Sequence, residues 1–249
     1  MGLSSKMGEN KTGLARGGRE EAMVEGTEEF ENLHAGDASG IAAERVERAK
    51  QATGGVGSMP PPAGVKQVGK AAMGALVGGS PNLFIDKLGE RLAFERMGVR
   101  LYDALLSKLA AYGGFDGGPS KGDLERFRSE ELEHLHLLIR SIEDLGGDPT
   151  VITPSANVIA VASQGITSVL VDARTSLEQS LGAILVAELA DRDSWEGLIA
   201  LAREAGQKEM ARAFEEALSE EESHLRKVRL WVTNGMGLKP QRPVAQPRA

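Results

Sequence analysis

The sequence predicts an all-α protein built around an antiparallel four-helix bundle, with a long crossover between the second and third helices. Three observations carry this prediction. Four segments show the apolar period of amphipathic helices, two of the three links between them are short, and each inward face carries an acidic residue near its middle. The four predicted helices cover residues 82–112, 121–145, 177–205 and 207–233.

Glycine and proline mark where these helices end. A glycine pair beginning at Gly113 follows the first pattern, and the run 146–149 (GGDP) ends the second. Only Gly206 separates the third pattern from the fourth, which indicates a tight antiparallel hairpin. The link over 148–175 is far longer, as expected for a crossover connection. It holds two apolar runs, 158–162 and 166–171.

Polar segments flank the predicted bundle. Residues 1–60 are rich in Gly, Glu, Lys and Arg, and such a segment cannot bury enough apolar surface to offset its chain entropy. Within this arm we expect at most a short helix over 38–51 and a weakly amphipathic docking segment over 64–78. The predicted organisation is a disordered or loosely helical arm over 1–80, a bundle over 81–234 and an extended Pro-rich tail over 235–249.

Composition narrows the class of function. The formal net charge of −7 argues against a nucleic-acid-binding surface. The absence of cysteine excludes disulfides, zinc ribbons, iron–sulfur clusters and thiol catalysis. No segment has the pattern of a secretory signal or the 18 clean apolar residues of a membrane span, so we expect a cytoplasmic protein without a membrane partner.

Helical spacing places acidic residues and histidines on the apolar faces. On the last helix, steps of four and three residues lead from Phe214 through Glu221 and His224 to Trp231. The second helix repeats this pattern, and the first and third helices each carry one glutamate on the equivalent face. The candidate metal ligands are Glu95, Glu131, His134, Glu188, Glu221 and His224.

A second Glu-x-x-His pair lies one step round the second helix. Glu133 and His136 have Ser129 and Arg140 as neighbours on the same face, which is the composition of a solvated surface. We therefore assign this pair to the outside of the bundle. The contrast shows that helical phase, and not the motif alone, selects the candidate ligands.

Buried acidic residues need a neutralising partner. Four buried carboxylates would carry −4 beside two neutral histidines, and no lysine or arginine falls on the seams as drawn. Two divalent cations would balance this charge; without them, crowding is expected to raise the carboxyl pKa values. Oxygen and imidazole donors without a thiolate suit iron or manganese better than a closed zinc site.

One glutamate from each of two helices, together with Glu-x-x-His from each of the other two, resembles the ferritin-like superfamily of di-metal bundles. The resemblance extends over 82–232. The stretches that carry it are 95–102 (ERMGVRLY), 130–134 (EELEH), 220–224 (EEESH) and Glu188 with the helix that follows it.

The resemblance implies a role for each candidate. Glu131 and Glu221 would bridge two metals, Glu95 and Glu188 would be terminal ligands, and each histidine would bind one metal. Tyr102 resembles the tyrosine that these proteins hydrogen-bond to a ligand carboxylate, and Trp195 takes the matching position in the other helix pair. We treat Tyr102 and Trp195 as candidate catalytic residues or core residues, and Asp191 as a neighbour of the ligands or an extra ligand.

The subfamily that the chain resembles is that of bacterioferritins and rubrerythrins. Leu132 stands where haem-binding relatives carry methionine, so we expect no haem, and the lack of cysteine removes a rubredoxin module. The expected function is oxidation of Fe(II) by O2 or H2O2 at two Fe ions, in iron handling or defence against oxidative stress. The alternatives are a catalase-like site with two Mn, or a non-catalytic binding protein stabilised by metal. A homo-oligomer and docking of an unidentified protein by the arms are also open.

Overall fold

The computed structural model describes residue 25, residues 39–57 and residues 81–238. The chain divides into two units, Met1–Gly54 and Gly55–Ala249, which are described separately. In the first unit, helix α2 (Ser39–Gln51) forms where the short helix over 38–51 was predicted, and its side chains are exposed. The expectations for the rest of the arm, for the segment 64–78 and for most of the tail lie outside the described residues.

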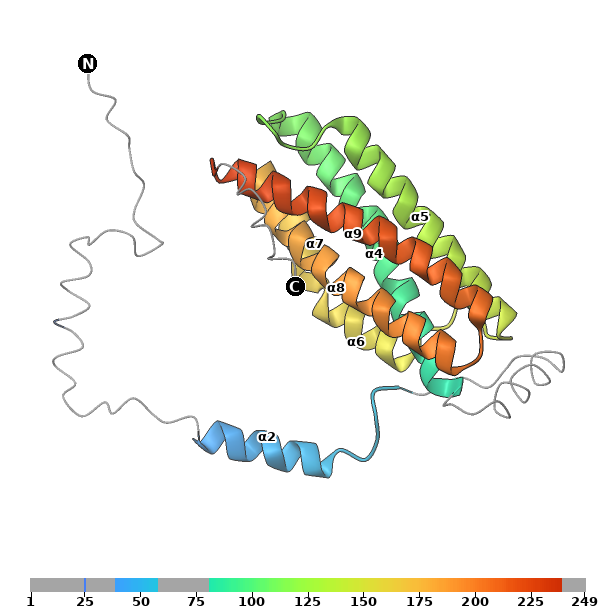
Figure 1. Cartoon of the computed structure of the whole chain (residues 1–249). Helices are drawn as coiled ribbons and strands as arrows, with labels where there is room; N and C mark the ends of the chain where they lie inside the picture. The colour runs from blue at the N-terminus through green and yellow to red at the C-terminus, as the bar shows by residue number, and fades with distance from the viewer. Residues whose placement is uncertain (1–24, 26–38, 58–80, 239–249) are drawn as a thin grey trace, which may run out of the picture. The chain divides into compact units, whose positions relative to one another are not determined.

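The second unit is an all-α bundle of four long helices (Figure 1). Their bounds are α4 (Pro81–Tyr112), α5 (Lys121–Asp144), α8 (Leu177–Glu204) and α9 (Lys208–Gly235). Each bound lies within a few residues of its predicted position, and no strand occurs in the described part of the chain. The predicted fold class, a four-helix bundle with a long crossover, is confirmed.

Contacts between helices show that the neighbours run antiparallel. In its first half, α4 meets the middle of α8, where the Arg91 and Asp191 side chains approach to 3.2 Å. Near its end, α4 meets the chain just before α8, where the Lys108 Nζ donates to the Thr175 carbonyl at 2.8 Å. The pair α5 and α9 behaves in the same way, since Lys227 donates to Asp123 at 2.7 Å from near the opposite end of its helix.

Local sequence explains where the helices begin and end. The Ser176 side chain accepts from the Gln179 backbone N–H, and the Gln179 side chain accepts from the Ser176 N–H, which is a capping box at the start of α8. Gly146 and Gly206 adopt φ values of 82° and 72°, a region that favours glycine, just after α5 and α8. These two glycines reverse the chain.

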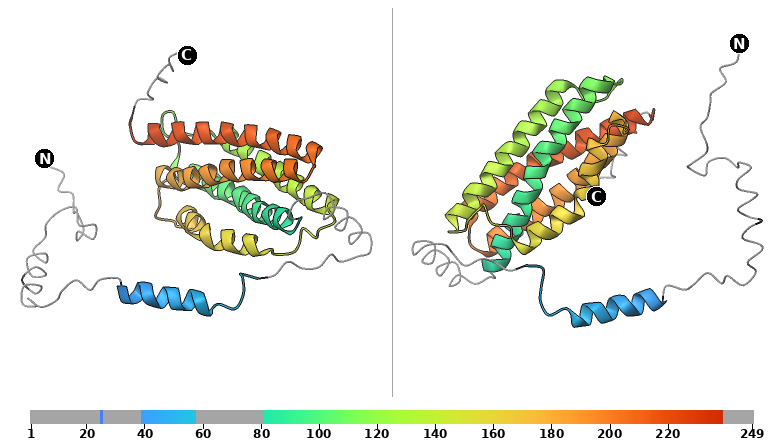
Figure 2. Two further views of the ribbon diagram at one scale, coloured as in Figure 1. Left: turned by 60° about the horizontal axis from the view of Figure 1, so that its bottom comes forward. Right: turned by 180° about the vertical axis from the view of Figure 1, so that it is seen from behind.

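The crossover consists of two short helices. α6 (Pro154–Ala162) and α7 (Gln164–Val171) contain the two apolar runs seen in the sequence. α6 packs on α4, whereas α7 contacts both α4 and α8, so the crossover lies along the outside of the bundle (Figure 2). The Asp86 carboxylate on α4 accepts from the Ser155 N–H at 2.9 Å and so fixes the start of α6.

Side chains on more than one face of α4 are buried. Val99 and Leu106 are only partly buried, whereas Phe94, Leu101 and Leu105 are 4%, 2% and 0% exposed. The reason is tertiary: α4 lies between the rest of the bundle and the crossover helices, so two of its faces are covered. Burial on two faces explains why Phe94, Leu101 and Leu105 are all buried on the same helix.

The core has two apolar clusters, one at each end of the bundle. One cluster gathers around Tyr102, Phe127 and Trp231, and the other gathers around Trp195 and Phe214. The buried acidic residues and histidines belong to neither cluster. They form a polar layer across the bundle, closed by apolar side chains at both ends.

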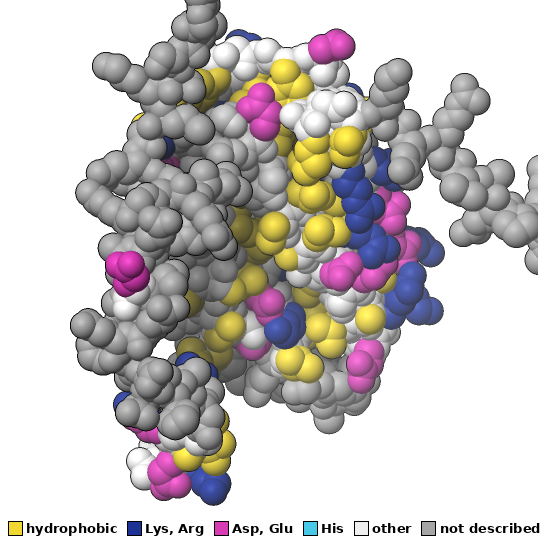
Figure 3. Space-filling view, turned by 90° about the vertical axis from the view of Figure 1, so that its left-hand side faces the viewer, with side chains coloured by type: hydrophobic (Ala, Val, Ile, Leu, Met, Phe, Trp, Pro, Cys, Tyr) yellow, Lys and Arg dark blue, Asp and Glu magenta, His cyan; other side chains and the backbone are white. Residues whose placement is uncertain are grey.

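Some hydrophobic side chains remain at the surface. Figure 3 shows a band of them on one face, beside interspersed basic and acidic side chains. Val161 in α6 and Val171 in α7 are 71% and 67% exposed. No single described helix is long and apolar enough to span a membrane; α6 and α7 pass a test of length and composition only as a pair bent by 41°.

Candidate metal centre

The six predicted ligands converge in the polar layer. Each is at most 3% exposed, and their possible ligand atoms form groups in which every atom lies within 4.8 Å of the others. The first group is Glu95, His134 and Glu221, and the second is Glu131, Glu188 and His224. A third group brings Asp191 together with Glu95, Glu131 and Glu221. All four long helices contribute, so the bundle must be assembled before the groups exist.

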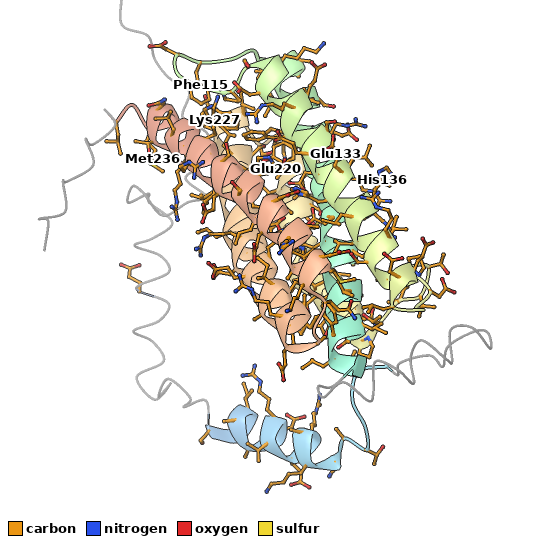
Figure 4. The ribbon with its side chains drawn as sticks, turned by 45° about the vertical axis from the view of Figure 1, so that its right-hand side comes forward. Phe115, Glu133, His136, Glu220, Lys227 and Met236 are labelled. Atoms are coloured by element: carbon orange, nitrogen blue, oxygen red, sulfur yellow. The ribbon has the colours of Figure 1, made fainter. Side chains whose placement is uncertain are left out.

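The two histidines are oriented by glutamates on the opposite helix. The His134 Nε2 on α5 donates to Glu220 on α9 at 2.8 Å, and the His224 Nε2 on α9 donates to Glu130 on α5 at 2.7 Å. Figure 4 shows Glu220 on α9 on the side toward α5. Each hydrogen bond turns the other ring nitrogen, Nδ1, toward the buried carboxylates. Neither Glu130 nor Glu220 was singled out from the sequence, although each immediately precedes a predicted bridging glutamate.

Glu221 lies at the centre of the cluster. Its carboxylate oxygens are 2.8 Å from the His134 Nδ1 and 3.4 Å from the His224 Nδ1, so one side chain reaches both groups. Glu131 approaches the His224 Nδ1 to 3.6 Å from the facing helix. These positions are compatible with the bridging roles implied by the family resemblance.

Burial controls the protonation of the carboxylates. It raises the pKa values of Glu95, Glu188 and Asp191 well above their ordinary range. Glu221 differs: burial opposes its charge, but contact with both histidines lowers the pKa of Glu221 to about 2. The expectation of raised carboxyl pKa values therefore holds for Glu95 and Glu188 and is wrong for Glu221.

The pKa values of both histidines are raised, which favours their charged form when no metal is bound. Burial opposes the positive form, but the hydrogen bond to Glu220 and the nearby carboxylates raise the pKa of His134 to about 11. The pKa of His224 is raised as well, against the effect of burial, by its contacts with Glu130 and Glu131. Without metal these shifts favour two charged histidines, whose protons offset part of the negative charge; the neutral histidines expected beside two metal ions stay a prediction.

An arginine also lies beside the cluster. Arg91 is 2% exposed; its Nε is 3.0 Å from Glu95, and its Nη1 is 3.2 Å from Asp191. The expectation that no lysine or arginine on the seams would compensate the buried carboxylates therefore missed Arg91, which contacts two of the buried carboxylates. Arg91 lies four residues before Glu95, and residues four apart share a helix face, so helical spacing from Glu95 could have found it.

The two candidate catalytic residues border opposite groups. The Tyr102 hydroxyl donates to Glu188, and its ring lies edge-on to Phe127 with centroids 5.7 Å apart. Trp195 lies edge-on to His134, with ring centroids 5.5 Å apart. The Trp195 Nε1 has no hydrogen-bond partner within the described chain. Their catalytic role stays a prediction.

The competing Glu-x-x-His pair lies on the surface as predicted. Glu133 and His136 are both exposed on the outer side of α5 (Figure 4). One residue of helical phase thus separates a buried pair from a solvated one on the same helix.

The cluster fits a metal because its inward atoms lack hydrogen bonds. Both carboxylate oxygens of Glu95 and Glu221, one oxygen each of Glu131 and Glu188, and both histidine Nδ1 atoms are buried without a hydrogen-bond partner in the described chain. Buried polar atoms are rarely left in this way unless an ion or water satisfies them. The donor set of carboxylate oxygen and imidazole nitrogen suits divalent transition metals.

Comparison with known proteins supports this interpretation. Residues 123–236 match the family model described as a ferritin-like domain. This range covers α5, the crossover, α8 and α9, and therefore five of the six candidate ligands; Glu95 on α4 lies before it. Searches of curated proteins and of solved structures gave no match.

Proposed function

Because the chain belongs to the ferritin-like superfamily, we propose that it is a di-iron carboxylate protein that oxidises Fe(II) with O2 or H2O2. Its buried carboxylate and histidine groups could hold metal. The more specific assignment, to an iron-handling or peroxide-defence protein without haem and without a rubredoxin module, belongs to the same proposal.

The single observation that carries the proposal is the set of unpartnered inward atoms on the six candidate ligands. Structural salt bridges would pair these atoms with one another in hydrogen-bonding geometry. Here the closest such pair, the His134 Nδ1 and a Glu221 oxygen, lies at 2.8 Å without that geometry, while the Nε2 of each histidine is hydrogen-bonded to a second carboxylate. A carboxylate behind a histidine is the usual way that proteins orient a metal-binding imidazole.

The charges of the described side chains support two divalent ions. Arg91 lies 3.2 Å from Asp191, so these two residues offset each other when Asp191 is ionised. The four glutamate ligands contribute −4 when ionised, and metal binding removes the protons from the histidine Nδ1 atoms. Two divalent cations therefore give a neutral layer.

The protein side chains have distinct tasks in the proposed reaction. Two iron ions, when bound, supply the electrons that reduce the oxidant, a step that carboxylates and imidazoles cannot perform. Glu130 and Glu220 keep the histidines in place, and Tyr102 holds Glu188. The apolar clusters at both ends of the layer keep bulk water out.

An anaerobic Fe(II) titration of the metal-free protein tests the proposal. We expect two tightly bound ions per chain, followed by rapid oxidation when O2 or H2O2 is added. Glu131→Ala and Glu221→Ala should each abolish tight binding of at least one ion and slow oxidation at least about tenfold. Glu133→Ala, an exposed glutamate on α5, is the matched control.

The titration also separates the alternatives. Fewer than two ions per chain, or oxidation unchanged in both ligand variants, would overturn the proposal. Preferential retention of manganese together with oxygen evolution from H2O2 would identify a catalase-like site. Metal-dependent melting without turnover of either oxidant would identify a metal-stabilised binding protein.

A further inference from the structure

The bundle has two halves, α4 with α5 and α8 with α9, and each half carries the same pattern of candidate ligands. The residues next to these ligands differ between the halves. Glu95 on α4 corresponds to Glu188 on α8. Four residues before them stand Arg91 and Ile184, and both side chains are buried. The two groups of ligands are thus equivalent in their own residues and unequal in their surroundings.

A second difference lies three residues after each glutamate. Asp191 follows Glu188, whereas Gly98 follows Glu95. A Cβ atom on Gly98 would lie 2.1 Å from the Glu131 Oε2, so this position has no room for a carboxylate. The Arg91–Asp191 pair joins α4 to α8, and the equivalent pair between positions 184 and 98 cannot form because those residues are Ile184 and Gly98.

Arg91 is held on the side of Glu95. Its Nε is 3.0 Å from that carboxylate, its Nη1 is 3.2 Å from Asp191, and its Cζ lies 4.1 Å from the centre of the Phe94 ring. The second group, around Glu188, has a tyrosine hydroxyl in place of a guanidinium. A permanent cation thus contacts a ligand of one group and of that group alone among the described residues.

We propose that Arg91 makes the two metal subsites unequal, so that the Glu188–His224 subsite fills first and the Glu95–His134 subsite fills second. The inference rests on the proposed function, since it assumes two bound ions. A metal at the Glu95–His134 subsite must share Glu95 with the guanidinium, and two cations on one carboxylate repel each other. Asp191 lessens this penalty because it retains the guanidinium when Glu95 turns to the metal. Arg91 is thereby a positioning residue that sets the order of loading.

Titration with Co(II), followed by calorimetry and by visible absorption, tests this order without oxidant. The wild-type protein should bind two ions in two resolved steps. His134→Ala should remove the weaker step, and His224→Ala should remove the tighter one. Arg91→Met should tighten the weaker step by roughly tenfold and leave the tighter step nearly unchanged. Arg96→Met, an exposed arginine on the same helix, is the control.

Two further variants separate contact from net charge and guard against misfolding. The double variant Arg91→Met/Asp191→Leu keeps the net charge of the protein, so tightening that persists in it comes from release of Glu95. Asp191→Asn leaves Arg91 with Glu95 as its remaining partner and should weaken the second step further, with helix content checked by circular dichroism.

Two outcomes would overturn the inference while leaving the proposed function intact. They are two ions bound with equal affinity, and a weaker step that neither Arg91 variant changes. Loss of the weaker step in His224→Ala would reverse the proposed order and also overturn it. Fewer than two ions in the wild-type protein would overturn both proposals, so the two failures are distinguishable.

Discussion

At the scale of single residues, the orientation of two histidines decides what the polar layer can do. An imidazole has two nitrogens, and a metal needs one of them free. Glu220 and Glu130 each accept a hydrogen bond from the Nε2 of a histidine on the opposite helix. Both Nδ1 atoms are therefore directed at the buried carboxylates. The two glutamates thereby connect α5 and α9, and they also determine that the Nδ1 atom of each histidine is the one free to bind a metal.

This crossed arrangement predicts a subsite-specific loss of affinity. Glu220→Gln keeps the shape of the side chain but removes the charge that orients His134, so binding at the Glu95–His134 subsite should weaken by about 10- to 100-fold. Glu130→Gln should do the same at the Glu188–His224 subsite. Co(II) titration measures both constants, and Glu133→Gln on the outer side of α5 is the control. Equal losses in all three variants would show a general charge effect and contradict the prediction.

At the scale of elements, the crossover is fastened to α4 at both ends. The Asp86 carboxylate accepts hydrogen bonds from Ser155 at the start of α6. At the far end, the buried Lys108 ammonium donates to Thr175 at 2.8 and 2.9 Å and to the Asp172 carbonyl. Polar contacts at both ends, together with apolar packing, therefore hold the crossover against α4.

Lys108 gives a testable measure of this attachment. Lys108→Met removes three hydrogen bonds to the chain after α7 but keeps the apolar stem. The free energy of unfolding should fall by roughly 1–3 kcal/mol, and amide exchange should speed up in α7 and in residues 172–176. Lys121→Met, which replaces an exposed lysine, is the control. Faster exchange confined to α5 and α9 would contradict the assignment.

At the scale of the whole molecule, the bundle encloses a charged layer between two apolar clusters. Such a layer is stable only when its charges are offset, and protons and metal ions compete for that task. In the metal-free protein the raised pKa values of the two histidines and of Glu95 and Glu188 favour bound protons, which offset the charge. Stability and metal binding are therefore linked through pH.

The direction of this linkage follows from the pKa shifts. The pKa of His134 rises from its ordinary value of about 6.5 to about 11, so its stabilising contribution is complete below about 6.5 and is lost as the pH rises toward 11. The raised pKa values of Glu95 and Glu188 act in the same direction above about 4.5. Glu221 acts in the opposite direction, because its contribution is lost as the pH falls from about 4.5 to about 2.

We therefore expect the metal-free protein to be most stable at mildly acidic pH and to lose stability as the pH rises through neutrality. Metal displaces the same protons, so metal affinity, and the difference in Tm between metal-loaded and metal-free protein, should grow with pH. Melting curves at pH 5.5, 7 and 8.5, with Co(II) or with a chelator, measure both trends. Metal-free stability that rises over this range would contradict the assigned protonation states.

The sequence by itself determined the four long helices, the six convergent residues and the exposure of Glu133 and His136. A helix period of 3.6 residues fixes which side chains share a face, and glycine after a helix fixes where it ends. Both signals are local, so they can be read from one segment at a time. The converging glutamates and histidines were predictable because each helix carries its own part of the pattern.

Only the tertiary structure determined which residues of different helices contact each other. The burial of both sides of α4, the partnership of Arg91 with Asp191 and the crossed hydrogen bonds of the two histidines all join residues from different helices. Helical phase says which way a side chain leaves its own helix, but not which neighbour lies within reach of a long arginine or glutamate. That choice depends on how the helices pack, and it determines both the charge balance and the inequality of the two subsites.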